Sequence, residues 1–169
     1  MNLSIVLIGN LISFTGAMVM IAIGLLKSKK SILVAQCFQF AVMGIGNLVL
    51  GGVTGFISNV VSIVRNLICF RWAFTLPLKL FFIALQILLS AHVNTMGLIG
   101  WLPIIAACLF TWFLDTPNEI FLKQVIILAQ VLWMVYDFTL CNYASTLFDV
   151  LTVATTLVGI FRIQKSRQN

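Results

Sequence analysis

The feature that most constrains the fold of this chain is a series of long apolar segments separated by only a few polar residues. Hydrophobic side chains make up 62% of the 169 residues and charged side chains only 8%, which is too little charge to cover the surface of a soluble domain. The first segment, Leu3 to Leu26, is as long as a membrane span and follows no charged region, so we expect a retained helix and not a signal peptide. The sequence therefore predicts an all-α integral membrane protein.

Polar residues between the apolar segments predict seven transmembrane helices. We expect the helices at residues 3–26, 31–50, 53–70, 74–93, 97–114, 119–140 and 143–163. The connections are a few residues long, which leaves no room for a soluble domain or a long catalytic loop. Residues 1–169 are thus expected to form a single transmembrane domain in a lipid bilayer, with any function inside the membrane.

The basic residues lie on one side of this predicted topology. Nine of the ten Lys and Arg residues fall in or beside the segments that follow the first, third, fifth and seventh spans, and the tenth, Arg65, lies within a span. The positive-inside rule makes that side cytoplasmic and places the N-terminus outside. Topology also accounts for the net charge of +6, so no nucleic acid partner is expected.

The third predicted span carries a polar stripe. Ser58, Asn59, Ser62, Arg65 and Asn66 recur at spacings of three, four and seven residues, which places them on one side of a helix. A polar side chain in hydrocarbon is costly unless it meets a partner or water, so the stripe is expected to face the interior of the bundle. Arg65 lies toward the cytoplasmic side and is a candidate inner gate or polar plug. An alternative is that its side chain extends to a lipid phosphate.

A shift of 90 residues superimposes the first three predicted spans on the last three. The shift aligns Asn47 with Asp137, Asn59 with Asp149, Ser62 with Thr152, and Asn66 with Thr156. This match predicts two parallel three-helix repeats, residues 1–72 and 97–169, joined by a linker helix in residues 73–96. An alternative is that the match of polar positions arises by chance from aligning two unrelated amphipathic spans. Parallel repeats of this kind build transporters with a site at the repeat interface.

The aligned polar groups predict a solute-binding site in the outer half of the membrane. The candidate substrate-binding residues are Asn47, Asn59, Ser62, Trp133, Asp137, Asp149 and Thr152. Asn and Asp side chains offer donors and acceptors to a small polar solute such as a sugar, a nucleoside or a vitamin-like molecule, and Trp133 offers a flat apolar face. Asp137 and Asp149 are also candidate proton sites, because a carboxylate within a span tends to carry protons or to meet a cation.

No pattern of catalytic or metal-binding residues is visible. The four cysteines lie far apart without a CxxC motif, and His92 is the only histidine, with no HExxH or GxSxG sequence. We therefore expect neither an enzyme nor a bound cofactor or metal. Two classes of function stay open, a transporter and a non-transporting membrane interaction or regulatory protein. The doubled polar stripe favours transport, since an interaction protein does not need aligned Asn and Asp in both halves.

Several separated motifs also carry a resemblance to a known family. They are KSKK in the first loop, LVLGGVTGFISNVVSIVRNL with Arg65, LPIIAACLFTW at 102–112, WMVYDF at 133–138, and the closing GIFRIQK. On these motifs the chain resembles the YgjV family of bacterial inner-membrane proteins over essentially its whole length. The resemblance implies a location in the bacterial inner membrane and a helical fold, and it names no substrate.

The predicted arrangement of three, one and three helices is similar to that of the SWEET sugar facilitators and the PnuC vitamin transporters. In the SWEET family an Asn from the third helix of each repeat faces the sugar, which here corresponds to Asn59 and Asp149. SWEET bundles carry a set of hinge prolines, whereas this chain has only Pro77, Pro103 and Pro117. The resemblance therefore implies that glycines, together with Pro103, provide any bending of the helices.

Overall fold

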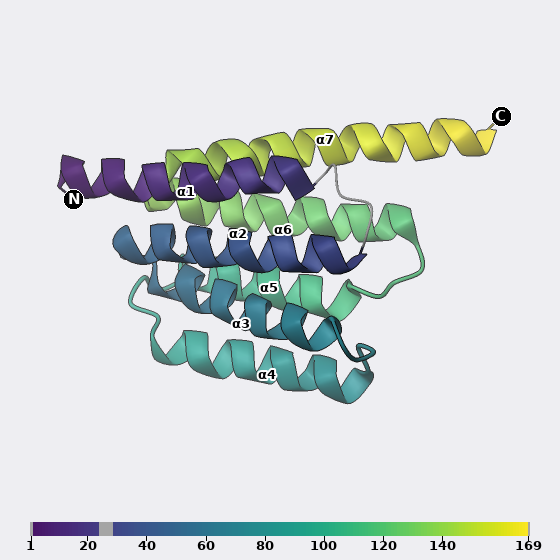
Figure 1. The fold of residues 1–169 in the computed structure, drawn as a ribbon, viewed down its shortest axis with the longest axis horizontal. Helices are drawn as coiled ribbons and strands as arrows, with labels where there is room; N and C mark the ends of the chain where they lie inside the picture. Colours follow the sequence, from purple (N-terminus) through teal and green to yellow (C-terminus); the bar gives the residue numbers. More distant parts are fainter. Residues whose placement is uncertain (1, 24–28, 169) are drawn as a thin grey trace.

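The computed structural model describes residues 2–23 and 29–168, and these residues form seven α-helices (Figure 1). The helices are α1 (Leu3–Ile23), α2 (Lys29–Val49), α3 (Val53–Cys69), α4 (Leu76–His92), α5 (Trp101–Phe113), α6 (Glu119–Thr139) and α7 (Tyr143–Gln168). The prediction of an all-α chain with seven helices is confirmed. The largest differences are at α7, which ends at Gln168, five residues beyond its expected end, and at α5, which begins four residues later than expected because residues 97–100 form a turn, with Gly97 at a φ of 57°.

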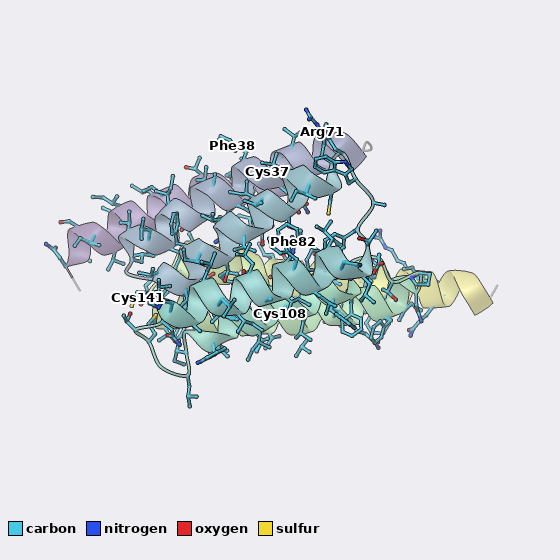
Figure 2. All side chains as sticks on the ribbon, turned by 90° about the horizontal axis from the view of Figure 1, so that it is seen from below. Cys37, Phe38, Arg71, Phe82, Cys108 and Cys141 are labelled. Carbon is cyan, nitrogen blue, oxygen red and sulfur yellow. The ribbon has the colours of Figure 1, made fainter. Side chains whose placement is uncertain are left out.

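Successive helices run in opposite directions, so the bundle has two distinct ends (Figure 1). The N-terminal end holds the N-terminus and the connections α2–α3, α4–α5 and α6–α7. The C-terminal end holds the connections α3–α4 and α5–α6 and the last turns of α7. The basic residues Arg71, Lys79, Lys123, Arg162 and Lys165 all belong to segments at the C-terminal end. Figure 2 shows this separation for Cys141 at one end and Arg71 at the other.

Six of the helices follow one another around a closed ring. Each of α1–α2, α2–α3, α5–α6 and α6–α7 packs as a sequential pair, and the pairs α3–α5 and α1–α7 close the ring between the two halves of the chain. The remaining helix, α4, packs against α3 and α5. It therefore lies outside the ring, at the edge of the bundle in Figure 1.

The distribution of polarity is the reverse of that in a soluble protein. Large apolar side chains such as Leu88, Phe138 and Phe161 are 63–70% exposed, while Asn47 and Asn142 are at most 2% exposed. Within the described residues, α6 and α7 each contain a stretch long and apolar enough to cross a membrane, and the other apolar helices are shorter. A helical body with an apolar outer surface and a polar interior is suited to hydrocarbon, where every backbone polar group has to be satisfied within the helix.

Two short turns at the N-terminal end have the same geometry. Gly51, between α2 and α3, has a φ of 83°, and Cys141, between α6 and α7, has a φ of 58°. The next N–H in each turn donates back to the end of the helix, from Gly52 to the Asn47 carbonyl at 2.7 Å and from Asn142 to the Asp137 carbonyl at 2.9 Å. These bonds satisfy helix-terminal carbonyls and reverse the chain within a few residues. Asn142 is thereby placed inside the bundle, where it is fully buried.

Candidate functional site

A cavity of about 350 Å³ lies inside the bundle, lined by residues of α2, α3, α5, α6 and α7. All eight side chains that the sequence singled out line its walls, namely Asn47, Asn59, Ser62, Arg65, Trp133, Asp137, Asp149 and Thr152. The structure thus brings the candidate residues together from four helices. Their role in binding a solute stays a prediction.

Contacts between α3 and α6 hold the bundle together at the N-terminal end of the cavity. The Tyr136 hydroxyl accepts a hydrogen bond from the backbone N–H of Gly55 at 2.9 Å and another from the Thr54 hydroxyl at 3.1 Å. The Tyr136 ring is fully buried and packs with Leu50 and Leu140 into one apolar cluster. This cluster separates the cavity from the turns at the N-terminal end.

Asparagine side chains form a further contact between the two halves of the chain at this end. The Asn142 side-chain amide donates to Asn47 Oδ1 at 2.9 Å and also bonds to the Asp137 carboxyl group. Asn59 lies deeper and donates from Nδ2 to the carbonyl of Gly55 in its own helix, at 2.9 Å. The polar groups at this end are therefore held in fixed positions by neighbouring protein groups.

The two carboxylates of the cavity are incompletely satisfied. Asp137 is 2% exposed and Asp149 is 6% exposed. Asp137 Oδ1 and Asp149 Oδ2 accept no hydrogen bond from any described residue. A buried carboxylate oxygen without a donor is costly unless a proton, water or a ligand compensates it. These two oxygens are therefore the groups in the cavity that most strongly favour a bound ligand.

Arg65 lies at the other end of the cavity, toward the C-terminal end of the bundle. Its Nη1 donates to Thr111 Oγ1 at 3.0 Å, its Nε and Nη2 lie 3.4 and 3.3 Å from Asn66 Oδ1, and its guanidinium carbon is 5.2 Å from the centre of the Phe110 ring. Asn66 in turn donates to Gln36 Oε1 at 3.1 Å. The side chain is only 2% exposed, so the alternative that it extends to a lipid phosphate is wrong.

The sequence analysis missed several residues that complete the site. Gln130 lines the cavity, while Thr111, Tyr136 and Asn142 hold other members of the site in place. Tyr136 stands in an apolar run and resembles an interfacial aromatic residue, and Asn142 falls in a predicted loop. Gln130 carried a usable signal as a polar residue within a predicted span, and the same holds for the lining residues Gln36, Gln39 and Thr156.

One ion pair among the described residues lies outside the cavity, at the C-terminal end. Lys79 of α4 pairs with Asp115 in the α5–α6 connection and also donates to the Trp112 carbonyl at 3.3 Å. The hydrogen bond from Lys79 holds the pKa of the Asp115 carboxyl below its usual range. Arg65 has no carboxylate partner among the described residues, and its hydrogen-bond partners are the neutral side chains of Thr111 and Asn66.

An apolar exterior around an internal cavity that holds buried polar and charged side chains defines a helical membrane protein with an internal chamber. The comparison with known families agrees, because the model of the Imp-YgjV family, described as bacterial inner membrane protein, matches residues 7–167. The chain belongs to this family, which confirms the resemblance drawn from its motifs and its location in the bacterial inner membrane. No curated protein and no solved structure matches the chain.

Proposed function

We propose that the protein transports a small polar solute across the bacterial inner membrane by alternating access, with the N-terminus outside and the C-terminus in the cytoplasm. The observation that carries the proposal is the single cavity on which all the candidate polar residues converge. Its volume of about 350 Å³ is at the lower end of the range of roughly 300–1,000 Å³ that is usual for small-molecule sites. The location of the basic residues at the C-terminal end supports the orientation.

Helix boundaries support two repeats, residues 1–72 and 97–169, joined by the linker of residues 73–96. Helix α2 begins at Lys29 and ends at Val49, and α6 begins and ends 90 residues later, at Glu119 and Thr139. Two of the three left-handed turn residues among the described residues, Gly51 and Cys141, are also 90 residues apart. A twofold axis relating the two halves would place α1 on α5 and α3 on α7. It would therefore exchange the α1–α7 contact with the α3–α5 contact, and both contacts are present.

The cavity walls support the same symmetry. Seven pairs of lining residues are separated by 90 positions: Gln36 and Ile126, Gln39 and Ala129, Phe40 and Gln130, Met43 and Trp133, Asn47 and Asp137, Asn59 and Asp149, and Ser62 and Thr152. Chance alignment of two amphipathic spans accounts for polar matches in a sequence, but it does not explain why both members of each pair face one cavity. A site at the interface of parallel repeats is typical of transporters.

Alternating access needs contacts that open one at a time at the two ends. At the N-terminal end Tyr136 of α6 holds α3, and at the C-terminal end Arg65 of α3 holds Thr111 of α5. Both contacts join the first half of the chain to the second. Breaking one while the other persists would expose the cavity to one side of the membrane, which gives each contact the role of a gate.

A ligand screen followed by a flux measurement tests the proposal. Purified protein is screened by thermal shift against sugars, nucleosides, vitamins, amino acids and amines, since a bound solute raises the apparent stability by mass action. Any solute that binds is then followed into proteoliposomes. Thr152→Leu, in the cavity, is expected to abolish uptake, whereas Thr155→Leu, exposed on the same helix, is the matched control. A solute that stabilises the protein but never crosses the membrane would contradict transport.

Proton coupling through Asp137 or Asp149 is part of the proposal. A buried carboxyl group that exchanges its proton with each side of the membrane would link uptake to pH. Asp149→Asn is then expected to remove the pH dependence of uptake, and Asp115→Asn, outside the cavity, is expected to retain it. An unchanged pH dependence in Asp149→Asn and in Asp137→Asn would remove coupling from the proposal.

The second candidate is a non-transporting membrane interaction or regulatory protein. The apolar outer surface, with side chains such as Phe38 projecting outward in Figure 2, is available to a partner helix as well as to lipid. Under this function the cavity residues would matter for stability alone. A partner that copurifies with the protein, together with no solute binding in the screen, would favour it.

A further inference from the structure

We propose that the solute carries a positively charged nitrogen, which the cavity binds between Asp137 and Asp149 against aromatic walls. This inference rests on the proposed function, because it assigns the class of solute to the same cavity. The class is a small organic monocation, such as an alkylammonium or a quaternary ammonium compound.

The charged side chains inside the cavity favour a cationic solute. Three of the described lining residues carry formal charges: the guanidinium of Arg65 and the carboxylates of Asp137 and Asp149. Their sum is −1 when both carboxylates are ionised. A charge in a low-dielectric interior is costly unless it is compensated. A monovalent cation brings the cavity to neutrality, whereas a sugar or a zwitterion leaves the charge at −1.

The unsatisfied hydrogen-bonding groups of the cavity lie on its two carboxylates. One oxygen of each carboxylate, Asp137 Oδ1 and Asp149 Oδ2, has no donor among the described residues, and both side chains are more than nine-tenths buried. Arg65 has no such deficit, since Thr111 and Asn66 accept from it. Along α3, Arg65 also lies about 9 Å of helix rise beyond Asn59, the counterpart of Asp149, at ~1.5 Å per residue. The end of the cavity that needs a ligand is therefore the acidic one.

Aromatic side chains form part of the cavity wall near the two carboxylates. Trp133 lies one helical turn from Asp137, Phe148 precedes Asp149, and Phe40 faces the cavity from α2. Aromatic faces attract organic cations through the ring quadrupole, and Trp does so most strongly. Together with the volume of about 350 Å³, these faces favour an organic cation over a bare metal ion.

The experiment compares a cation with its neutral isostere. Binding to the full-length protein in detergent is measured by thermal shift and calorimetry with choline, with methylammonium, and with 3,3-dimethylbutan-1-ol, which replaces the choline nitrogen by carbon. Sodium chloride at equal concentration controls for ionic strength. Choline or methylammonium is expected to bind, and the neutral alcohol and sodium are not. Equal binding of the alcohol, equal stabilisation by sodium, or binding of neither ammonium compound would overturn the inference.

Variants then test whether the carboxylates act through their charge. Asp149→Asn is expected to weaken the binding of the ammonium compound by about tenfold or more, since it removes one of two buried charge partners. Asp115→Asn makes the same chemical change outside the cavity and is expected to leave binding unchanged. The double variant Asn59→Asp/Asp149→Asn moves the carboxylate to the equivalent position of the other half and is expected to restore most of the affinity. A folded double variant with no restored binding would show a structural role and would contradict the inference.

The outcomes separate this inference from transport itself. Ammonium binding without flux into proteoliposomes would support the proposed cation site and contradict the proposed transport function. Flux of a neutral solute without ammonium binding would retain the carrier and contradict the cation site.

Discussion

The Tyr136 hydroxyl of α6 accepts a hydrogen bond from the Gly55 backbone N–H of α3 at 2.9 Å. Gly55 lies in the first turn of α3, where backbone N–H groups have no partner within the helix. A side chain from the other half of the protein therefore satisfies a helix N-terminus, and the contact is possible because residue 55 has no Cβ. The first prediction follows from this closeness.

Gly55→Ala is expected to destabilise the protein by about 1–3 kcal/mol through overpacking. A Cβ at this position would lie 2.7 Å from the Tyr136 ring and 2.8 Å from Asn47 Nδ2, so the contact between α3 and α6 would have to open. The free energy of unfolding in detergent measures the effect. Gly159→Ala is the control, because its Cβ would meet the flexible end of Lys123 at 3.1 Å. Equal stability of the two variants would argue against a tight contact at Gly55.

Thr111→Val is expected to destabilise the protein by about 1–3 kcal/mol, because it leaves Arg65 Nη1 buried without its acceptor. Arg65→Met removes the charge and the need for an acceptor at the same time. In the double variant Arg65→Met/Thr111→Val the cost of the valine is thus expected to fall, with a coupling of about 0.5–3 kcal/mol in a double-mutant cycle. Strict additivity of the two free-energy changes would contradict a direct contact.

Cys141→Gly is expected to stabilise the protein slightly. Cys141 has a φ of 58°, a conformation that costs a residue with a side chain roughly 1–2 kcal/mol, whereas glycine adopts it freely and loses about 0.5–1 kcal/mol of chain entropy instead. The net gain should be under about 1 kcal/mol. Gly51→Ala at the equivalent turn makes the reverse exchange at a φ of 83° and is expected to destabilise. Thermal unfolding of both variants checks whether the two changes have opposite signs.

Asp115 is expected to contribute a small stability that depends on pH. Its pKa is lower in the folded protein because Lys79 donates to its carboxylate. The contribution is therefore present above the ordinary pKa of Asp and is lost as the pH falls through the lowered value in the folded state. Asp115 is exposed, so the loss in Asp115→Asn should be below about 1 kcal/mol at neutral pH. The difference in stability between wild type and variant should vanish in acid, and a difference that grows in acid would contradict the assignment.

The fold was predictable because the lengths of the apolar segments and the polar residues between them indicate where each helix begins and ends. Three residues of the polar stripe of α3, Asn59, Ser62 and Arg65, line the cavity, and the shift of 90 residues aligns Asn47 and Asn59 with two further lining residues, Asp137 and Asp149. Both signals come from side chains that hydrocarbon would penalise. Because a polar side chain exposed to hydrocarbon is costly, its position in the sequence predicts which face of the helix points into the bundle.

The partners of these groups were not predictable. Tyr and Thr also occur on apolar helix faces, so the presence of Tyr136 and Thr111 in a span does not predict a polar site. Their roles depend on which helices of the two halves touch, α3 with α6 and α3 with α5. Such long-range contacts are set by packing of the whole bundle and not by local periodicity.

The position of α4 outside the ring has a consequence for how such a protein can be assembled. The described walls of the cavity come from the helices on either side of α4 and none comes from α4 itself. It returns the chain to the opposite end of the bundle, so that the second triplet starts in the same direction as the first, and it also packs on α3 and α5, where Gln86 donates to Ser58 Oγ at 2.7 Å and Lys79 pairs with Asp115. Two separate polypeptides, one carrying α1–α4 and the other α5–α7, are therefore expected to rebuild the chamber when coexpressed, because the covalent link after α4 forms no part of its described walls.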